Sequence, residues 1–392
     1  MARSLLHYAE VGNTSKCYRL LRQSYPVDVD ATAQDGSTPL MIAVDKGYSN
    51  SNIVTLLLQH GANPNFVNTV NGKTVLVTAV VRGHHDICRT ILQYRADPNQ
   101  KMKLPSEEAL PEFSPLYMAA IGTKDVKMCE ILLKFGADPN KEHFLTNENI
   151  ANTGSYYNQM KHYADMMKKA SNGFVKESNM KMEGSSCLLM LSTISKQNEI
   201  CSILLQHGAN VNWSSSESKV TPLHIAAMDG NVDLISILLS DGYGADIDVR
   251  DIQGNSPLYY AVQHGQTGAV KLLLEKGANE DIEIGLGVTP LHDACFSGDK
   301  ETAKLLLKHG ADVEGKIRKN LHVACSRGNL EVVKLLVESG ADVERFDESG
   351  STPLHCAAAG NHPDVVTYLI VDAGCDKNKV RTSIKQLVDI RL

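Results

Sequence analysis

The 392-residue sequence has few of the features that mark membrane-bound, secreted or nucleic-acid-binding proteins. No window approaches about 18 consecutive apolar residues, so no membrane-spanning helix is predicted. Residues 1–21 lack a long apolar core and a small-residue cleavage site, which makes them a poor secretory signal. The 39 Lys and Arg are outnumbered by 45 Asp and Glu, whereas binding to phosphate needs a concentrated basic surface. We therefore expect no nucleic acid among the main partners.

Cysteine is also sparse, and its spacing is irregular. The nine cysteines are scattered and contain no C-x-x-C pair, so neither a disulfide framework nor a zinc ribbon is predicted. Reduced thiols of this kind are typical of proteins of the cytoplasm, which is the expected location, or of the nucleus.

What the sequence does have is an internal repeat. The segment GVTPLHDACFSGDKETAKLLLKHGAD, at 287–312, recurs in altered form along the chain. The glycines near the end of successive units lie 36, 33, 33, 30 and 34 residues apart, at the following positions: Gly208, Gly244, Gly277, Gly310, Gly340 and Gly374. Self-similarity at this period is typical of a solenoid, in which stacked units bury the apolar faces that one unit alone would expose.

Each unit predicts two helices separated by a turn. Thr289 is a favourable N-cap, and Pro290 suits the first helical position because its missing N–H would have no partner there. Gly298 ends this short helix. A second helix is predicted through 302–307, where apolar residues follow a helical period. Gly310 then provides a left-handed C-cap.

These units resemble the ankyrin repeat family. The resemblance rests on T-P-L-H, A-A-x-x-G, V-V-x-L-L-L and G-A-D, which recur in this order over nearly the whole chain. It implies an all-α solenoid of about ten helix-turn-helix units, with β-turn fingers that project from one edge. The first unit, from residue 4 to about residue 36, is degenerate and is typical of an N-terminal cap.

The repeat pattern divides the chain into four segments: an N-terminal cap with ankyrin repeats at 1–140, a helical insertion or long finger at 141–184, further ankyrin repeats at 185–379 and a C-terminal capping helix at 380–392. Within the second segment, Tyr156, Met160, Tyr163 and Met167 share one face of a predicted helix. Either a degenerate repeat or a finger that contacts a partner fits this pattern. The last segment contains residues 383–388, which are similar to the box through which ankyrin-bearing ubiquitin-ligase adaptors recruit elongin, although Val388 replaces its cysteine.

One junction between units is predicted to be weak. The unit that begins at Lys319 and Asn320 lacks both the threonine cap and the proline, and the preceding finger is about three residues short.

The polar residues of the repeat do not predict an active site or a metal centre. The resemblance implies a structural role for His224, His292, His322 and His355, which occupy the same slot of four units and would bond to finger backbone. Packed helices lie about 8–10 Å apart, too far for equivalent residues to share a zinc ion at about 2.0–2.3 Å. No nucleophile motif is present. We therefore predict no enzyme activity, no cofactor, no metal and no small-molecule substrate.

Function is then expected on the surface that varies between units. The resemblance implies that partners bind a concave face formed by the fingers and the first helices. The two variable positions of A-A-x-x-G would lie on this face, and they hold Asp45, Lys46, Val81, Arg82, Met228, Asp229, Gln263, His264, Phe296, Ser297, Ser326 and Arg327. Phe296, Met228 and Arg327 are the types that anchor interfaces.

Two finger residues add to this prediction. Trp213, the only tryptophan, is expected either to contact a partner or to pack against the serine-rich loop that follows it. Residues 204–212 are similar to the ankyrin segment modified by the asparaginyl hydroxylase of the hypoxia pathway, which would act on Asn212.

Together these observations predict a non-enzymatic scaffold or adaptor that binds a protein partner. A preformed surface costs little ordering entropy when it binds. The alternatives are a substrate adaptor of a ubiquitin ligase, a regulatory subunit of a channel or kinase complex, and an enzyme with a converging polar pocket. The sequence does not predict which partner is bound.

Overall fold

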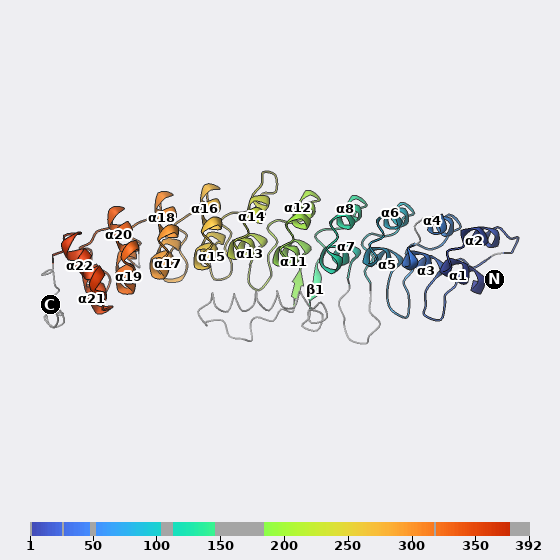
Figure 1. Cartoon of the computed structure of the whole chain (residues 1–392), viewed down its shortest axis with the longest axis horizontal. Coiled ribbons are helices and arrows are strands. Elements are labelled where there is room, and N and C mark those ends of the chain that lie inside the picture. Colours follow the sequence, from blue (N-terminus) through green and yellow to red (C-terminus); the bar gives the residue numbers. More distant parts are fainter. Residues whose placement is uncertain are drawn as a thin grey trace. The chain divides into compact units, whose positions relative to one another are not determined.

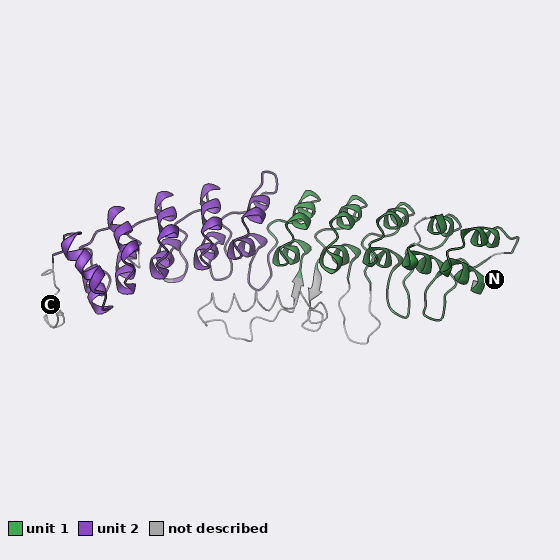
Figure 2. Cartoon of the chain, in the orientation of Figure 1, with its two compact units in different colours: residues 1–213 green, residues 214–392 purple. Residues whose placement is uncertain are grey.

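The computed structural model describes residues 2–25, 27–47, 52–102, 113–145, 184–316 and 319–376. The chain forms two compact units, Met1–Trp213 and Ser214–Leu392 (Figure 2). Most of the segment predicted to be an insertion, 146–183, lies outside the described residues. The predicted capping helix at 380–392, with the elongin-like box, lies outside them as well.

The first unit contains five helix pairs among its described residues. They are α1 (Ala2–Glu10) with α2 (Thr14–Leu21), α3 (Pro39–Lys46) with α4 (Asn52–Gln59), α5 (Val75–Val81) with α6 (His85–Gln93), α7 (Pro115–Tyr117) and its π-helical continuation η1 (Met118–Thr123) with α8 (Val126–Lys134), and α11 (Leu188–Ile194) with α12 (Asn198–Gln206). First helices contact first helices, and second helices contact second helices, so the unit has two helical layers (Figure 1).

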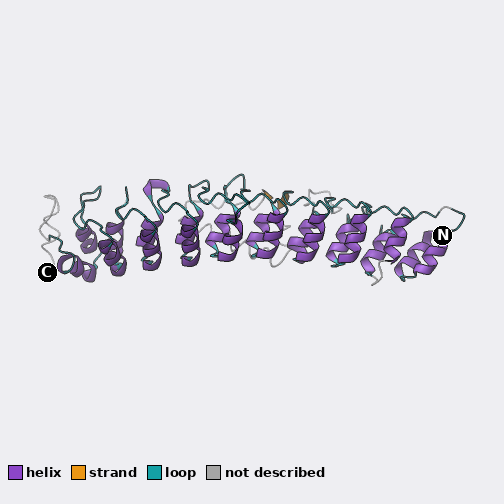
Figure 3. Cartoon of the chain, turned by 90° about the horizontal axis from the view of Figure 1, so that it is seen from above, coloured by secondary structure: helices purple, strands orange, loops and turns teal. Residues whose placement is uncertain are grey.

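The second unit repeats this arrangement in the part that the structure describes. Its five pairs are α13 (Pro222–Met228) with α14 (Val232–Leu238), α15 (Pro257–Gln263) with α16 (Thr267–Glu275), α17 (Pro290–Ser297) with α18 (Lys300–Lys308), α19 (Asn320–Arg327) with α20 (Leu330–Glu338), and α21 (Pro353–Ala359) with α22 (Pro363–Val371); the 3₁₀ turn η3 (Gly285–Gly287) lies in a finger. In each unit the long loops lie along one edge of the helices (Figure 3). The predicted all-α solenoid of about ten units is confirmed.

A short sheet interrupts this pattern in the first unit. Strand β1 (His143–Leu145) pairs antiparallel with strand β2 (Gly184–Ser186), so that His143 lies opposite Ser186. The sequence carries no signal for these strands, because three residues are too few to show an alternating pattern.

The first helices begin as the sequence predicts. The hydroxyl groups of Thr38, Ser114, Ser256 and Thr289 each accept a hydrogen bond from the backbone N–H three residues later, at 3.1–3.3 Å. Each of these helices then starts with proline. The leucine and alanine that follow face the core: Leu258, Leu291 and Ala294 are fully buried.

The repeated histidine bonds to the backbone of the next finger at His224 and His322, and His224 makes the more complete set of bonds. Its Nδ1 accepts from the Thr221 backbone N–H at 3.2 Å, and its Nε2 therefore donates to the Asn255 carbonyl of the next finger at 3.1 Å. Burial lowers the pKa of His224, which favours the neutral imidazole that these bonds need. The same Nε2 bond joins His322 to the Ser351 carbonyl at 3.0 Å.

At the junction predicted to be weak, the N-cap hydrogen bond is missing and other hydrogen bonds replace it. Lys319 gives α19 no side-chain cap, and the Nδ1 of His322 has no hydrogen-bond partner among the described residues. Asn320, which is fully buried, instead donates to the Asp312 and Val313 carbonyls at 3.0 and 3.2 Å. The short finger is thus tied to the start of α19 by a different side chain.

Candidate protein-binding surface

The ends of the first helices are held in place by the neighbouring repeat. The side-chain amide of Asn329 donates to the Cys295 carbonyl at 2.8 Å, and Nε2 of His362 contacts the Ser326 carbonyl at 3.1 Å. Gln266 donates in the same way to the Met228 carbonyl at 3.2 Å. These bonds fix the backbone from which the variable residues project, so the surface is formed before any partner binds.

The variable positions of the second unit fall into three groups. Phe296, Ser297, Ser326 and Arg327 are exposed, whereas Asp229, Gln263 and His264 are half-buried. Met228 is only 1% exposed, so the expectation that it projects from this face is wrong.

The burial of Met228 is shared by some of the equivalent positions but not by all, since Val81 and Phe296 in the same slot are exposed. Two equivalent positions in the first unit, Ile121 and Ile194, are also buried, at 7% and 8% exposure. Methionine is unbranched and flexible, so it can fold onto neighbouring side chains and leave the solvent. The slot alone does not decide whether a residue is available to a partner.

Phe296 and Arg327 form the most distinctive cluster on this surface. Phe296 is 47% exposed, and the guanidinium carbon of Arg327 lies 3.6 Å from the centre of its ring. This cation–π stack joins two adjacent repeats, α17 and α19. No ion pair to Arg327 is formed by any residue in the described ranges. Both side chains are of the types that dominate interface energetics.

In the first unit the corresponding positions carry a closed ion pair. Nε of Arg82 donates to Asp45 at 2.8 Å, with both side chains about half exposed to solvent. Lys46 is exposed, and Val81 is 44% exposed. An exposed ion pair contributes little to stability, and here it already satisfies the only arginine among these positions.

Trp213 lies half-buried in its finger and has a specific partner. Its indole N–H donates to the Glu142 carboxylate at 3.1 Å. This bond ties the finger to the segment that precedes β1. Whether Trp213 also contacts a partner protein stays a prediction.

Asn212 is exposed, and its backbone N–H donates to Oδ1 of Asn210 at 3.1 Å. The matching residue Asn99 shows what this slot does in the first unit. Its side chain accepts from the Asp138 N–H at 2.8 Å and donates to the Gly136 carbonyl at 3.0 Å. At Asn99 the asparagine side chain links two fingers. Modification of Asn212 stays a prediction.

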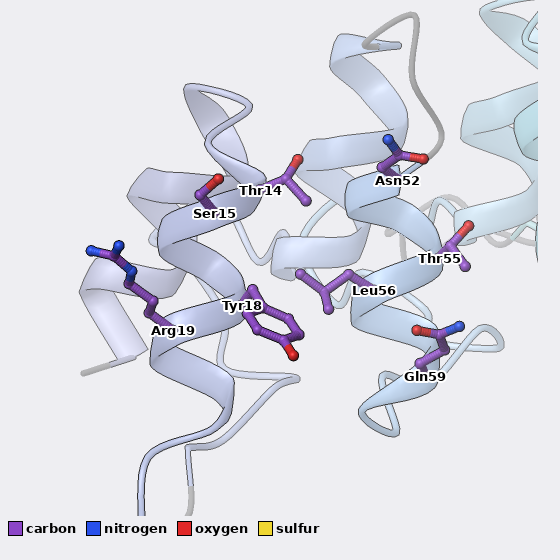
Figure 4. Close-up of a pocket in the computed structure, with 8 residues that line it drawn as sticks. All are labelled: Thr14, Ser15, Tyr18, Arg19, Asn52, Thr55, Leu56 and Gln59. Carbon is purple, nitrogen blue, oxygen red and sulfur yellow. The ribbon is translucent and has the colours of Figure 1, made fainter.

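A groove that the sequence does not reveal lies between α2 and α4 (Figure 4). It has a volume of about 610 Å³. The ring of Tyr18, which is 42% exposed, and the side chain of Leu56 face one another across the gap between the helices (Figure 4). The remaining lining residues are Thr14, Ser15, Arg19, Asn52, Thr55 and Gln59. Their polar character is typical of a solvated helix face, so no sequence signal marks them.

The core contains several buried thiols. Burial raises the pKa of the Cys88, Cys129 and Cys187 thiols to about 12, which keeps these groups protonated. Within the described ranges, no group of three His, Cys, Asp or Glu side chains could hold a metal ion. No helix in the same ranges is long and apolar enough to cross a membrane.

Comparison with known families identifies the repeats. A model described as ankyrin repeats in three copies matches residues 5–102, 157–251 and 243–317. A second, described as ankyrin repeats in many copies, matches 321–370, and a single-repeat model matches 112–143. The chain belongs to the ankyrin repeat family. Repeats of this family are typically non-enzymatic interaction modules, and here they form a protein–protein interaction domain.

Curated relatives share short stretches of these repeats. The chain is 45% identical over 69 residues to human Arf-GAP with coiled-coil, ANK repeat and PH domain-containing protein 2, which covers 17% of this chain and 9% of that protein. It is 39% identical over 98 residues to the Bos taurus SMC5-SMC6 complex localization factor protein 1, covering 24% and 9%. It is 34% identical over 149 residues to human Ankyrin repeat and SOCS box protein 16, covering 36% and 32%. The chain thus matches at most 32% of the length of these relatives.

Proposed function

We propose that this protein is a non-enzymatic scaffold or adaptor that binds a protein partner on the exposed ends of its first helices. The observation that carries the proposal is the exposed stack of Phe296 and Arg327, which spans two repeats; no residue in the described part of the chain forms an ion pair with the guanidinium. An exposed aromatic ring beside an arginine is the composition expected of an interface anchor.

The rigidity of this surface supports the same proposal. Asn329 and His362 hold the ends of α17 and α19 by side-chain bonds to the Cys295 and Ser326 carbonyls. The stack further restricts the Arg327 side chain. Binding would therefore order few groups, and most of the contact energy would appear as affinity.

The test is quantitative affinity purification from native lysate with the full chain. The double variant Phe296→Ala, Arg327→Ala removes the stack. The matched control is Lys304→Ala, Lys308→Ala, which alters two exposed residues of the second helix α18. Partners that the wild type and the control capture equally, and that the first variant loses, support the proposed surface. Equal capture by all three proteins would contradict it.

A ubiquitin-ligase substrate adaptor is the second candidate. Its support is the 34% identity to a protein named Ankyrin repeat and SOCS box protein 16, together with the elongin-like box at 383–388. Recombinant elongin would then co-purify with the full chain but not with a Leu387→Asp variant. Absence of co-purification would exclude this candidate.

We also propose that the protein resides in the cytoplasm or the nucleus and that Asn212 is hydroxylated. All nine cysteines are free, which supports a protein of the cytoplasm or the nucleus. The exposed finger position of Asn212 supports access by an asparaginyl hydroxylase. Intact-mass analysis after expression with the hydroxylase would show an added oxygen atom in the wild type but not in an Asn212→Ala variant.

A further inference from the structure

We propose that Arg327 recognises a carboxylate, so that the partner segment carries an Asp or Glu side chain next to an apolar side chain that covers Phe296. This inference deepens the proposed function and rests on it. It commits to an acidic polypeptide as the occupant of the surface formed by Phe296 and Arg327.

The geometry of the stack is the first argument. Arg327 lies over the Phe296 ring at 3.6 Å. A guanidinium is planar, and its N–H donors point outward in that plane. A ring beneath it therefore holds the group in position and leaves the donors available to a bidentate acceptor such as a carboxylate.

Charge is the second argument. Other arginines near the repeat ends already have anionic partners inside the chain: Arg82 pairs with Asp45 at 2.8 Å, and Arg345 pairs with Glu314 at 3.3 Å. Arg327 has no such ion pair in the ranges that the structure describes. It is thus an oriented and uncompensated positive charge on a chain whose formal net charge is −6.

The neighbouring hydroxyl groups already use their donors within their own helices. The hydroxyl groups of Ser297 and Ser326 donate to carbonyls of their own helices, those of Ala294 and Val323, at 3.2 and 2.9 Å. The Phe296 carbonyl accepts from Asn329 at 3.4 Å. The features left for recognition are the guanidinium and the exposed part of the ring, which together select an acidic group beside an apolar one.

The experiment uses a display library of random heptapeptides, selected in parallel on the full wild-type chain and on an Arg327→Gln variant. We expect Asp or Glu next to an apolar residue to be enriched on the wild type and not on the variant. Peptides recovered on the wild type are then labelled and titrated by fluorescence anisotropy. Loss of one charge-assisted bond predicts affinity lower by on the order of tenfold for Arg327→Gln.

Two further variants make the readout specific. Arg327→Lys keeps the charge but not the planar fork, so its affinity should lie between those of the wild type and Arg327→Gln. The matched control is Arg89→Gln, which alters an arginine that already pairs with Asp86 at 3.1 Å. It should bind the peptides as the wild type does.

The outcomes separate this inference from the proposed function. Neutral peptides that lose affinity with Phe296→Ala would overturn carboxylate recognition and keep the surface. Acidic peptides that bind Arg327→Gln as tightly as the wild type would also overturn it. Peptides that bind both variants unchanged but are lost with Tyr18→Ala would move binding to the α2–α4 groove and overturn both proposals. No enrichment over the uncoated matrix would likewise overturn both.

Discussion

At the scale of single residues, the repeat motif predicts a role better than it predicts exposure. The histidine slot is defined by bonds to the backbone, and His224 makes them as expected. The variable slot depends on what lies next to it. Met228 is buried, whereas Phe296 is 47% exposed. Both occupy the first variable position of A-A-x-x-G, so the motif does not distinguish them.

The burial of Met228 predicts a large cost for a charge at this position. Met228→Glu would bury a carboxylate at a position built for an apolar side chain, so the free energy of unfolding should fall by about 3 kcal/mol. Phe296→Glu, on the exposed position of α17, should lower it by about 1 kcal/mol. Urea unfolding followed by circular dichroism compares the two. Equal costs would mean that Met228 is not enclosed in solution.

The buried His224 predicts a pH dependence of stability. Burial lowers its folded pKa below the ordinary value of 6.5, so the unfolded chain takes up a proton first as the pH falls. The contribution of His224 is complete above about pH 6.5 and is lost as the pH falls through the lower folded value. Urea unfolding should therefore give a lower free energy of unfolding at about pH 5 than at about pH 7.5.

The control for this effect is a variant pair. A His224→Gln variant should lose less stability between the two pH values than the wild type, because it removes one of the groups that titrate. His7→Gln, at an exposed histidine of α1, should keep the wild-type pH dependence. If His224→Gln also kept it, the acid loss would have to come from other groups.

At the scale of elements, the sequence predicts where the first helices begin because caps are local. Thr289 and Pro290 suffice to place the start of α17. The end of a helix is less certain. In the fourth pair the chain runs on into the π-helical turn η1, and Lys124 adopts a φ of 55° where most other repeats place glycine. The wider turn of a π-helix contains about one more residue than an α-helical turn, and the spacing of apolar residues in the sequence does not reveal it.

Glycines that follow helices have two functions in this fold, and two positions separate them: Gly298 ends the first helix α17, and Gly277 follows the second helix α16. Gly298 has a φ of 79°, and a Cβ there would lie 2.8 Å from Oδ1 of Asn329 in the next repeat. Gly277 has a φ of 88° and no atom within 4 Å of such a Cβ. Gly298 therefore serves the backbone conformation and the contact between repeats, whereas Gly277 serves the conformation alone.

This difference predicts unequal costs for the same substitution. Gly277→Ala should lower the free energy of unfolding by about 1 kcal/mol, which is the left-handed penalty for a residue with a Cβ. Gly298→Ala should cost about 2 kcal/mol or more, because the Asn329 side chain must also leave the Cys295 carbonyl. Urea unfolding of both variants measures the difference. In an Asn329→Ala background, Gly298→Ala should cost only about as much as Gly277→Ala; an undiminished cost in that background would contradict the contact.

At the scale of the whole molecule, the stack of helix pairs could be predicted because the signals that define a helix pair lie within each repeat. Caps, glycines and apolar spacing recur in most units, and ten pairs follow among the described residues. The β1–β2 pairing and the groove between α2 and α4 could not be predicted, because both depend on contacts between distant segments rather than on a repeated motif.

The division into two compact units predicts that residues 214–392 fold without the rest of the chain. This piece contains five complete helix pairs, and the stability of a repeat array is a sum of repeat and nearest-neighbour contributions. We expect a helical circular dichroism spectrum and a cooperative urea transition. The control piece, 232–392, lacks α13 and so exposes the face of α15 that contacts it.

The comparison of the two pieces tests whether a stable folding unit begins at Ser214. If α13 stabilises its neighbours by burying residues such as Leu223 and Ala226, the shorter piece should unfold at a lower urea concentration. The longer piece should also bind the selected peptides with the affinity of the full chain, because Phe296 and Arg327 both lie within it. A piece 214–392 without a cooperative transition would show that its repeats need neighbours from the first unit.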